Sequence, residues 1–288
     1  RCHPAGKHFP KFSKFEERLH IMFELNFLWI GLVEIFSHFV QGCTGFGATV
    51  IQAPVATGLL GTAEGVPFGT LITMPMLYVL GIKAFKQVSW KDLAKIVILM
   101  APGVLVGHRL FLSISANTAK VCIGFIVTCI ALRGVLQKFV FEPRKAKQGD
   151  VVVEEKEDKP EGIGMKVFRY GCLLLGGAVH GAFNIGGPLV TVYTIYSVKD
   201  KSAFRATMTW VWIIINTCFN MVNQYLTGQW TEHMWWALAW CVPMAAVGFY
   251  LGAVFHKKIN HDTFLKFVYV VLMIVGGDMF IRALLTFI

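Results

Sequence analysis

The stretch GCTGFG at residues 42–47 decides the fold, because a similar glycine-rich stretch, GAFNIGGP, recurs at residues 181–188. We call each stretch a break, because its glycines are expected to interrupt a helix. The first glycines of the two stretches are 139 positions apart. Other landmarks keep the same order at 140 or 141 positions, pairing Trp90 with Trp230, Pro102 with Pro243 and Gly107 with Gly248. A slowly drifting offset across several landmarks indicates an internal duplication. The sequence therefore predicts two halves built to one plan, each interrupted by a glycine-rich break.

The composition is typical of a membrane protein. Of the 288 residues, 55% are hydrophobic and 15% are charged, against about 25% charged in ordinary globular chains. Residues 170–198 and 206–231 contain no Asp, Glu, Lys or Arg. Each of these runs exceeds the roughly 20 residues that cross a bilayer core. We therefore predict an all-α polytopic membrane protein that is surrounded by the lipid bilayer.

The charge pattern divides the chain into four parts. Residues 1–24 place apolar side chains at helical spacing among basic ones, which predicts an amphipathic segment lying on the membrane surface. Residues 142–166 are rich in both signs of charge and contain two prolines, which predicts a solvated linker. Residues 25–141 and 167–288 are then a first and a second transmembrane repeat, each with a glycine-broken helical hairpin and further transmembrane helices.

Each repeat is expected to cross the membrane an odd number of times, whether its short second segment spans or re-enters. An odd number inverts the second repeat relative to the first, and inverted repeats with broken helices are the architecture of secondary transporters. Most of the 27 Lys and Arg residues fall in the linker or in loops on the same side. By the positive-inside rule we expect a multi-pass protein of the cell membrane, with a cytoplasmic linker and both termini outside.

The two breaks predict an anion-binding site between the halves. Glycines permit backbone turns that other residues resist, and Pro188 suits the first turn of a restarting helix. The free amides at such a restart, together with the positive end of the helix dipole, attract an anion. Close helix packing is the alternative use of these glycines. The recurrence of the break in both halves favours the anion site.

Polar side chains in the breaks and on a later helix are candidate ligands. The candidates in the breaks, backbone positions included, are Gln41, Thr44, Gly45, Phe46, Gly47, His180, Asn184, Ile185, Gly186 and Gly187. Within residues 203–226, one helical face carries Trp212, Asn216, Asn220 and Asn223. A polar stripe in lipid must turn toward protein or a cavity. Hydrogen bonding between helices is the alternative role for each of these side chains.

Ionisable residues in apolar segments are further candidates. Arg205 lies at the expected cytoplasmic edge of its helix, where it could bind an entering anion or anchor the helix. Glu34 and His38 are four residues apart, which suits a proton relay or a structural pair. Asp278 is expected near the membrane surface or paired with Arg282.

The sequence resembles the sulfite exporter TauE/SafE family, also called the TSUP permeases, from about Leu25 to Ile288. The resemblance is carried by the two breaks with Pro54 downstream, by FRAT at residues 204–207 and by the paired Pro and Gly landmarks. The family's first break often has a glycine triplet, whereas Ala48 and Thr49 follow Gly47 here. The resemblance implies transport of sulfur-containing anions such as sulfite, thiosulfate or organosulfonates.

We therefore predict a secondary transporter that exports small sulfur-containing anions by alternating access, since an inside-negative membrane potential drives anions outward. Transport of small carboxylates, a membrane enzyme and a scaffold are the alternatives. No enzymatic motif is visible, and the seven cysteines lack zinc-site spacing, so we expect no catalysis, metal or cofactor. The basic residues lie in loops, which argues against a nucleic-acid partner, and the sequence leaves a homo-oligomer open.

Overall fold

The structure is a computed structural model that describes residues 25–110, 121, 125, 128–129, 131–141 and 163–286. The amphipathic segment predicted for residues 1–24 and most of the predicted linker lie outside the described residues. The first half contains α2 (Leu25–Thr44), α3 (Ala48–Leu60), α4 (Thr62–Lys83), the 3-10 turn η1 (Phe85–Gln87), α5 (Trp90–Leu110) and the π-helix η2 (Leu136–Phe141). The second contains α8 (Ile163–Phe183), α9 (Gly187–Ser197), α10 (Lys201–Ile215), the π-helix η3 (Asn216–Met221), α11 (Val222–Leu226), α12 (Glu232–Lys258) and α13 (His261–Leu285). The linker range 142–166 overlaps the start of α8.

The lengths of these helices suit a membrane protein. Four helical stretches in the described part of the chain are long and apolar enough to cross a bilayer, namely Leu25–Thr44, Ala63–Lys83, Glu232–Lys258 and Asp262–Arg282. The helices that follow the breaks, α3 and α9, have 13 and 11 residues. At a rise of about 1.5 Å per residue they are too short to cross a hydrocarbon core of about 30 Å by themselves. The predicted all-α polytopic fold is confirmed.

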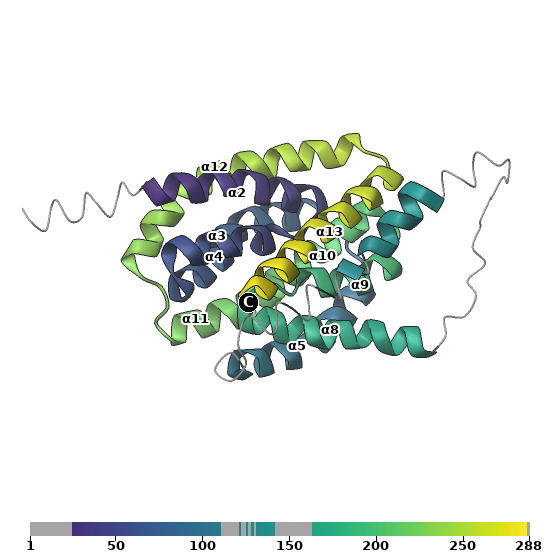
Figure 1. Cartoon of the computed structure of the whole chain (residues 1–288), viewed down its shortest axis with the longest axis horizontal. Helices are drawn as coiled ribbons and strands as arrows, with labels where there is room; N and C mark the ends of the chain where they lie inside the picture. The colour runs from purple at the N-terminus through teal and green to yellow at the C-terminus, as the bar shows by residue number, and fades with distance from the viewer. Residues whose placement is uncertain are drawn as a thin grey trace, which may run out of the picture.

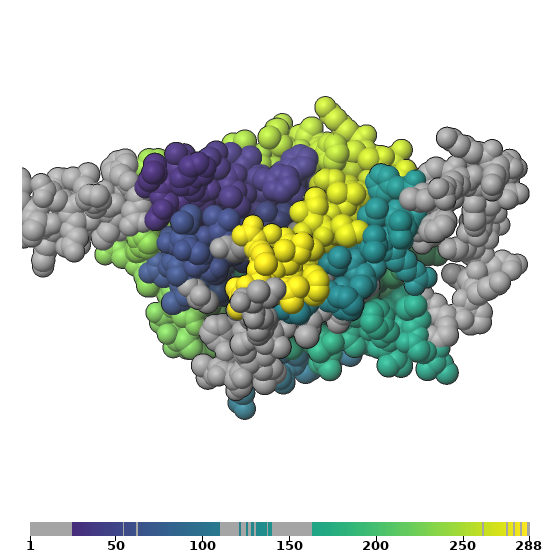
Figure 2. Space-filling model, viewed as in Figure 1, coloured from purple at the N-terminus to yellow at the C-terminus, as the bar shows by residue number. Residues whose placement is uncertain are grey.

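Each half packs its leading helix against a helix of the other half. Figure 1 shows α2 beside α12 along one edge of the molecule and α5 beside α8 along the opposite edge. Between these two pairs lie α4 and α10, which carry fully buried side chains such as Phe68 and Met208. The long helix α13 crosses the face shown in Figure 2 and is tied to η2 by the Lys138–Asp262 ion pair of 3.4 Å.

Glycines let the paired backbones approach closely. On α5, Gly103 and Gly107 lie against the carbonyls of Leu174 and Ala178. On α12, Gly248 and Gly252 lie against the carbonyls of Ile35 and Phe39. A Cβ atom at any of these glycines would collide with the carbonyl opposite. The contact of α5 with α8 and that of α12 with α2, which we call the two seams, therefore use the small-residue packing of membrane helices.

The contacts in the two seams give a different offset between corresponding glycines of α5 and α12 from the one that the sequence predicts. The carbonyls of Ile35 and Leu174 are 139 positions apart, but the glycines that meet them, Gly248 and Gly103, are 145 apart. The predicted pairing of Gly107 with Gly248 is therefore wrong by one helical turn. Both seams carry glycines four residues apart, so a shift of one turn leaves the sequence pattern almost unchanged. The inversion of the second half relative to the first stays a prediction.

The seams predict a contrast between two glycine substitutions. Gly248→Ala puts a methyl group into the Ile35 carbonyl, and such overpacking costs about 1–3 kcal/mol. Gly171→Ala on α8 meets nothing within 4 Å and should be neutral or slightly stabilising, because alanine favours helix. Thermal unfolding in detergent, followed by size-exclusion chromatography, should show a lower midpoint for Gly248→Ala only. Equal midpoints would contradict the close seam.

Candidate functional site

The first break is a tight turn made by two glycines. Helix α2 ends at Thr44 and α3 begins at Ala48, and Gly45 and Gly47 between them have φ angles of +82° and +98°. These angles lie in the left-handed region that glycine adopts without strain. The hydroxyl of Thr44 accepts a hydrogen bond from the Phe46 amide at 3.2 Å and lies 2.8 Å from the Val40 carbonyl. Thr44 therefore secures the turn.

The second break turns at Asn184. Helix α8 ends at Phe183 and α9 begins at Gly187, with Pro188 in its first turn as the sequence predicts. Asn184 has a φ angle of +59° and is the single non-glycine residue with a positive φ in the described part of the chain. Asparagine is among the residues that tolerate this conformation best. Asn184 and Gly45 are 139 positions apart, so both breaks turn at the same repeat position.

Each break rests on the central helix of the other half. Asn184 donates a hydrogen bond from Nδ2 to the Thr70 hydroxyl on α4, at 3.0 Å. Gly45 lies against α10, where an added Cβ would be 3.2 Å from the Thr209 hydroxyl. Thr70 and Thr209 are again 139 positions apart. The two breaks are therefore held by equivalent contacts that cross between the halves.

A small cavity lies where the breaks meet. Its volume is about 10 Å³, close to the space that one water molecule needs. It is lined by Gln41, Phe46, Gly47, Ala48 and Thr49 from the first break, by His180 and Gly187 from the second, and by Thr73, Leu77, Trp212 and Asn216. We call it the central cavity. The structure thus brings both breaks, and the starts of α3 and α9, to a single space.

One hydrogen-bond donor of the residues that line the central cavity has no protein acceptor in the described part of the chain. The indole Nε1 of Trp212 is buried and has no hydrogen-bond partner among the described residues. The first amides of α3 and α9 have no partner within their own helices, and the positive end of each helix dipole lies there. None of the described residues that line the cavity is Asp, Glu, Lys or Arg. These properties suit a small anion.

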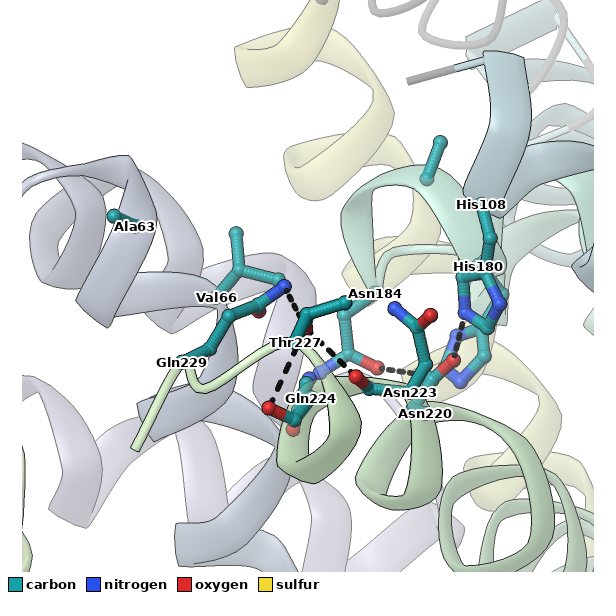
Figure 3. Close-up of a pocket in the computed structure, with 12 residues that line it drawn as sticks. Ala63, Val66, His108, His180, Asn184, Asn220, Asn223, Gln224, Thr227 and Gln229 are labelled. Carbon is teal, nitrogen blue, oxygen red and sulfur yellow. Dashed lines mark hydrogen bonds between the residues drawn. The ribbon is translucent and has the colours of Figure 1, made fainter. Parts of the chain in front are cut away.

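A larger cavity, which we call the vestibule, adjoins the central cavity at His180. Its volume is about 540 Å³, and Figure 3 shows its polar lining. The lining consists of Ala63, Val66, His108, His180, Gly181, Ala182, Asn184, Asn220, Asn223, Gln224, Thr227 and Gln229. These residues come from the start of α4, the end of α5, the second break and the segment from η3 to the loop after α11. No charged Lys, Arg, Asp or Glu side chain is among them.

A chain of hydrogen bonds links the vestibule to the central cavity, and Figure 3 shows its members that line the vestibule, among them Asn184 and Asn220. Asn220 donates from Nδ2 to Asn184 Oδ1 at 3.2 Å and to Asn216 Oδ1 at 3.0 Å. His180 Nε2 lies 2.8 Å from the same Asn216 oxygen. At the other end of the chain, the Thr70 hydroxyl accepts hydrogen bonds from both Asn184 and Gln224. The chain orients the second break and its neighbours as one unit.

Sequence reasoning missed several of these residues. Thr70, His108 and Gln224 are part of the vestibule or its hydrogen bonds, although no break or stripe contains them. The repeat offset of 139 positions could have identified Thr70, because the residue at the equivalent position is Thr209 in FRATMT, residues 204–209. The π-helix η3, which carries Asn216 and Asn220, had no sequence signal.

Other predicted residues lie outside both cavities. Ile185 is buried in the second break, and Gly186 packs against the Gly176 carbonyl, so both shape the turn. Arg205 is 7% exposed, which differs from the exposed position expected of an interfacial anchor.

The two pairs of ionisable residues are present as contacts. Glu34 and His38 are fully buried and lie 2.9 Å apart on α2, and neither is among the described residues that line the two cavities. A proton-relay role for this pair stays a prediction. Asp278 pairs with Arg282 at 2.5 Å on α13, which is one of the two placements that the sequence predicts for it.

Broken helices that meet at a small cavity inside an all-helical membrane fold are features of the class of membrane transporters. The model of the family described as Sulfite exporter TauE/SafE matches residues 30–279. The chain therefore belongs to this family, which suggests a membrane transporter of sulfur anions such as sulfite, and the resemblance seen in the sequence is confirmed. No curated protein and no solved structure matches the chain.

The crossed contacts predict unequal effects of two threonine substitutions. Thr70→Val removes the acceptor of two buried amide groups, and each unsatisfied donor costs about 1–3 kcal/mol. Thr209→Val, at the equivalent position, removes only the bond from its hydroxyl to the Arg205 carbonyl. Thermal unfolding should show a clearly larger loss of stability for Thr70→Val. A larger loss for Thr209→Val would show that the hydrogen-bond chain does not hold the second break.

Proposed function

We propose that this protein is a secondary transporter that exports sulfite or a related small sulfur oxyanion, and that the anion binds in the central cavity. The observation that carries the proposal is the meeting of two helix starts at one cavity whose described lining residues include no Asp or Glu. Membership of the sulfite exporter TauE/SafE family also supports the proposal.

The donors around the central cavity match the chemistry of a sulfur oxyanion. Such an anion spreads its charge over several oxygens, and its transfer from water requires several hydrogen bonds and a positive potential. The starts of α3 and α9 would supply amides to two sides of the anion. The Trp212 indole N–H would supply a third donor, because it has no acceptor among the described residues. In the described part of the chain, no carboxylate lines the cavity to repel the anion.

The size of the central cavity requires a movement of the halves. A volume of about 10 Å³ accommodates one water but not a sulfur oxyanion with its oxygens. The vestibule of about 540 Å³ adjoins it at His180. The two breaks must therefore separate for the anion to enter, which is the movement that alternating access provides. By the predicted topology the vestibule faces the outside.

The membrane potential supports export. An inside-negative potential favours the exit of an anion by about 2.3 kcal/mol per charge per 100 mV, so efflux needs no coupling ion. Neither residue of the buried Glu34–His38 pair is among the described residues that line the two cavities, and the proposal assigns the pair no step.

Counterflow in proteoliposomes tests the proposal. We expect radiolabelled sulfoacetate to exchange in vesicles that contain the protein and not in empty vesicles. Sulfite should inhibit this exchange, whereas malonate, its carboxylate analogue, should not. Exchange of malonate alone would indicate that the substrates are small carboxylates and not sulfur anions. Absence of any exchange would overturn the transport proposal.

Two tryptophans on α10 provide a matched test of the binding position. Trp212→Phe removes the unpartnered N–H but keeps an aromatic ring beside His180, whose ring centroid is 4.8 Å away. We expect about a tenfold higher half-saturating concentration of substrate, because a hydrogen bond to a charged group contributes about 1.5–3 kcal/mol. Trp210→Phe removes an N–H that donates to the Gly81 carbonyl and should leave that concentration unchanged. Equal effects of the two changes would place the anion elsewhere.

A further inference from the structure

Arg205 is a buried cation with unsatisfied donors. Its side chain lies in the second turn of α10, and its Nε and Nη2 atoms have no hydrogen-bond partner among the described residues. An isolated buried charge is costly unless an opposite charge or several hydrogen bonds accompany it. The burial of Arg205 therefore indicates that an anion binds there in some state of the protein.

The neighbours of Arg205 do not neutralise it. Lys201, one turn earlier, donates to the carbonyls of His256 and Ile259 at the end of α12, so helix-terminal carbonyls offset its charge. His256 and Cys43 are within electrostatic reach of Arg205. The nearby carboxylate of Asp200 caps the amide of Ala203. This end of α10 therefore carries an excess of positive charge.

The repeat relates this cluster to the vestibule. Three residues that line the vestibule are Val66, Ala182 and Asn184. The residues 139 positions away from them are Arg205, Cys43 and Gly45. These three also lie together, because Gly45 packs on the Arg205 carbonyl and the Cys43 thiol is within electrostatic reach of Arg205. They sit at the start of α10, whereas the vestibule lies at the far end of the same helical run.

The equivalent positions differ in exposure. Val66 and Ala182 line an open space, whereas Arg205 is 7% exposed and Cys43 is fully buried. Positions that the sequence repeat makes equivalent thus line an open space in one half and are buried in the other. A transporter built from two equivalent halves can reverse which side is open by exchanging the conformations of those halves.

We propose that Arg205 is the anion-binding residue of a second vestibule, which is the counterpart of the open one and is closed in this structure. The proposal rests on the proposed function, because it needs the protein to open alternately to its two sides. Its ligand is a small oxyanion such as a sulfonate or sulfite, which the planar guanidinium can bind through two parallel hydrogen bonds. Cys43 and Gly45 line this second vestibule when it opens.

The two vestibules then differ in charge. Arg205 attracts the anion on one side, and the equivalent residue on the other side is Val66, among amide and histidine side chains. By the predicted topology the Arg205 side is cytoplasmic. An anion is therefore captured by Arg205 inside the cell and leaves outside through a vestibule whose described lining has no Lys or Arg, which suits export.

The native Cys43 reports on this vestibule. We would keep Cys43, replace the other six cysteines with serine, and reconstitute the protein in vesicles of known orientation. The thiol would be exposed in turn to the anionic reagent sulfonatoethyl methanethiosulfonate and to the cationic reagent trimethylammonioethyl methanethiosulfonate. Either reagent converts the thiol to a mixed disulfide and releases methanesulfinate. We expect labelling from the linker side only, several-fold faster with the anionic reagent, and slowed by sulfoacetate.

Arg205→Gln should abolish the preference for the anionic reagent, and Arg205→Lys should retain it with weaker protection by sulfoacetate. Ala182→Cys in the same chain without native cysteines is the matched control, because Ala182 is the counterpart of Cys43 in the open vestibule. It should react from the opposite side, without a charge preference and at the same rate in the presence of Arg205→Gln. That equal rate also shows that Arg205→Gln leaves the fold intact.

The outcomes separate this proposal from the proposed function. If Cys43 stays unreactive from both sides, or reacts equally with both reagents while Arg205 is present, the second vestibule is overturned even where sulfoacetate counterflow succeeds. If counterflow fails but charge-selective, sulfoacetate-sensitive labelling of Cys43 is seen, the Arg205 site stands and transport of the sulfonate is overturned.

Discussion

The close backbone contact between helices of different halves is the constraint on which the rest of the structure depends. Helix α2 meets α12, and α5 meets α8, through glycines that lie directly against carbonyl groups. Because each leading helix is held by the other half, the ends of α2 and α8 are brought to the same central region. The first break then contacts Thr209 on α10, and the second break hydrogen-bonds to Thr70 on α4.

The proposed site uses helix ends and neutral donors instead of a fixed cation. A transport site must bind its ligand well enough to remove it from water and weakly enough to release it. The starts of α3 and α9 provide a moderate positive potential, and Trp212 adds a directed donor. Arg205, which carries a full charge, is not among the residues that line the central cavity. Its attraction would therefore assist capture of the anion without retaining it at the centre.

Particular residues show how far sequence reasoning reached. Pro188 begins α9 as expected, and both breaks, Trp212 and Asn216 do meet at one cavity. The register between Gly107 and Gly248 was wrong by a turn, since glycines spaced four apart look alike after such a shift. Thr70 and His108 were missed because their roles arise from partners more than 100 positions away. The π-helix was missed because no residue type marks it.

The sequence by itself determined the membrane environment, the helices, the positions of the two breaks and their recurrence. These follow from local causes, namely long apolar runs, glycines that permit a left-handed turn and a proline that starts a helix. Only the tertiary structure decided which polar residues face the central cavity and which face the vestibule, and that Arg205 is buried. Those facts depend on how helices from the two halves rotate and pack against one another, which no local pattern records.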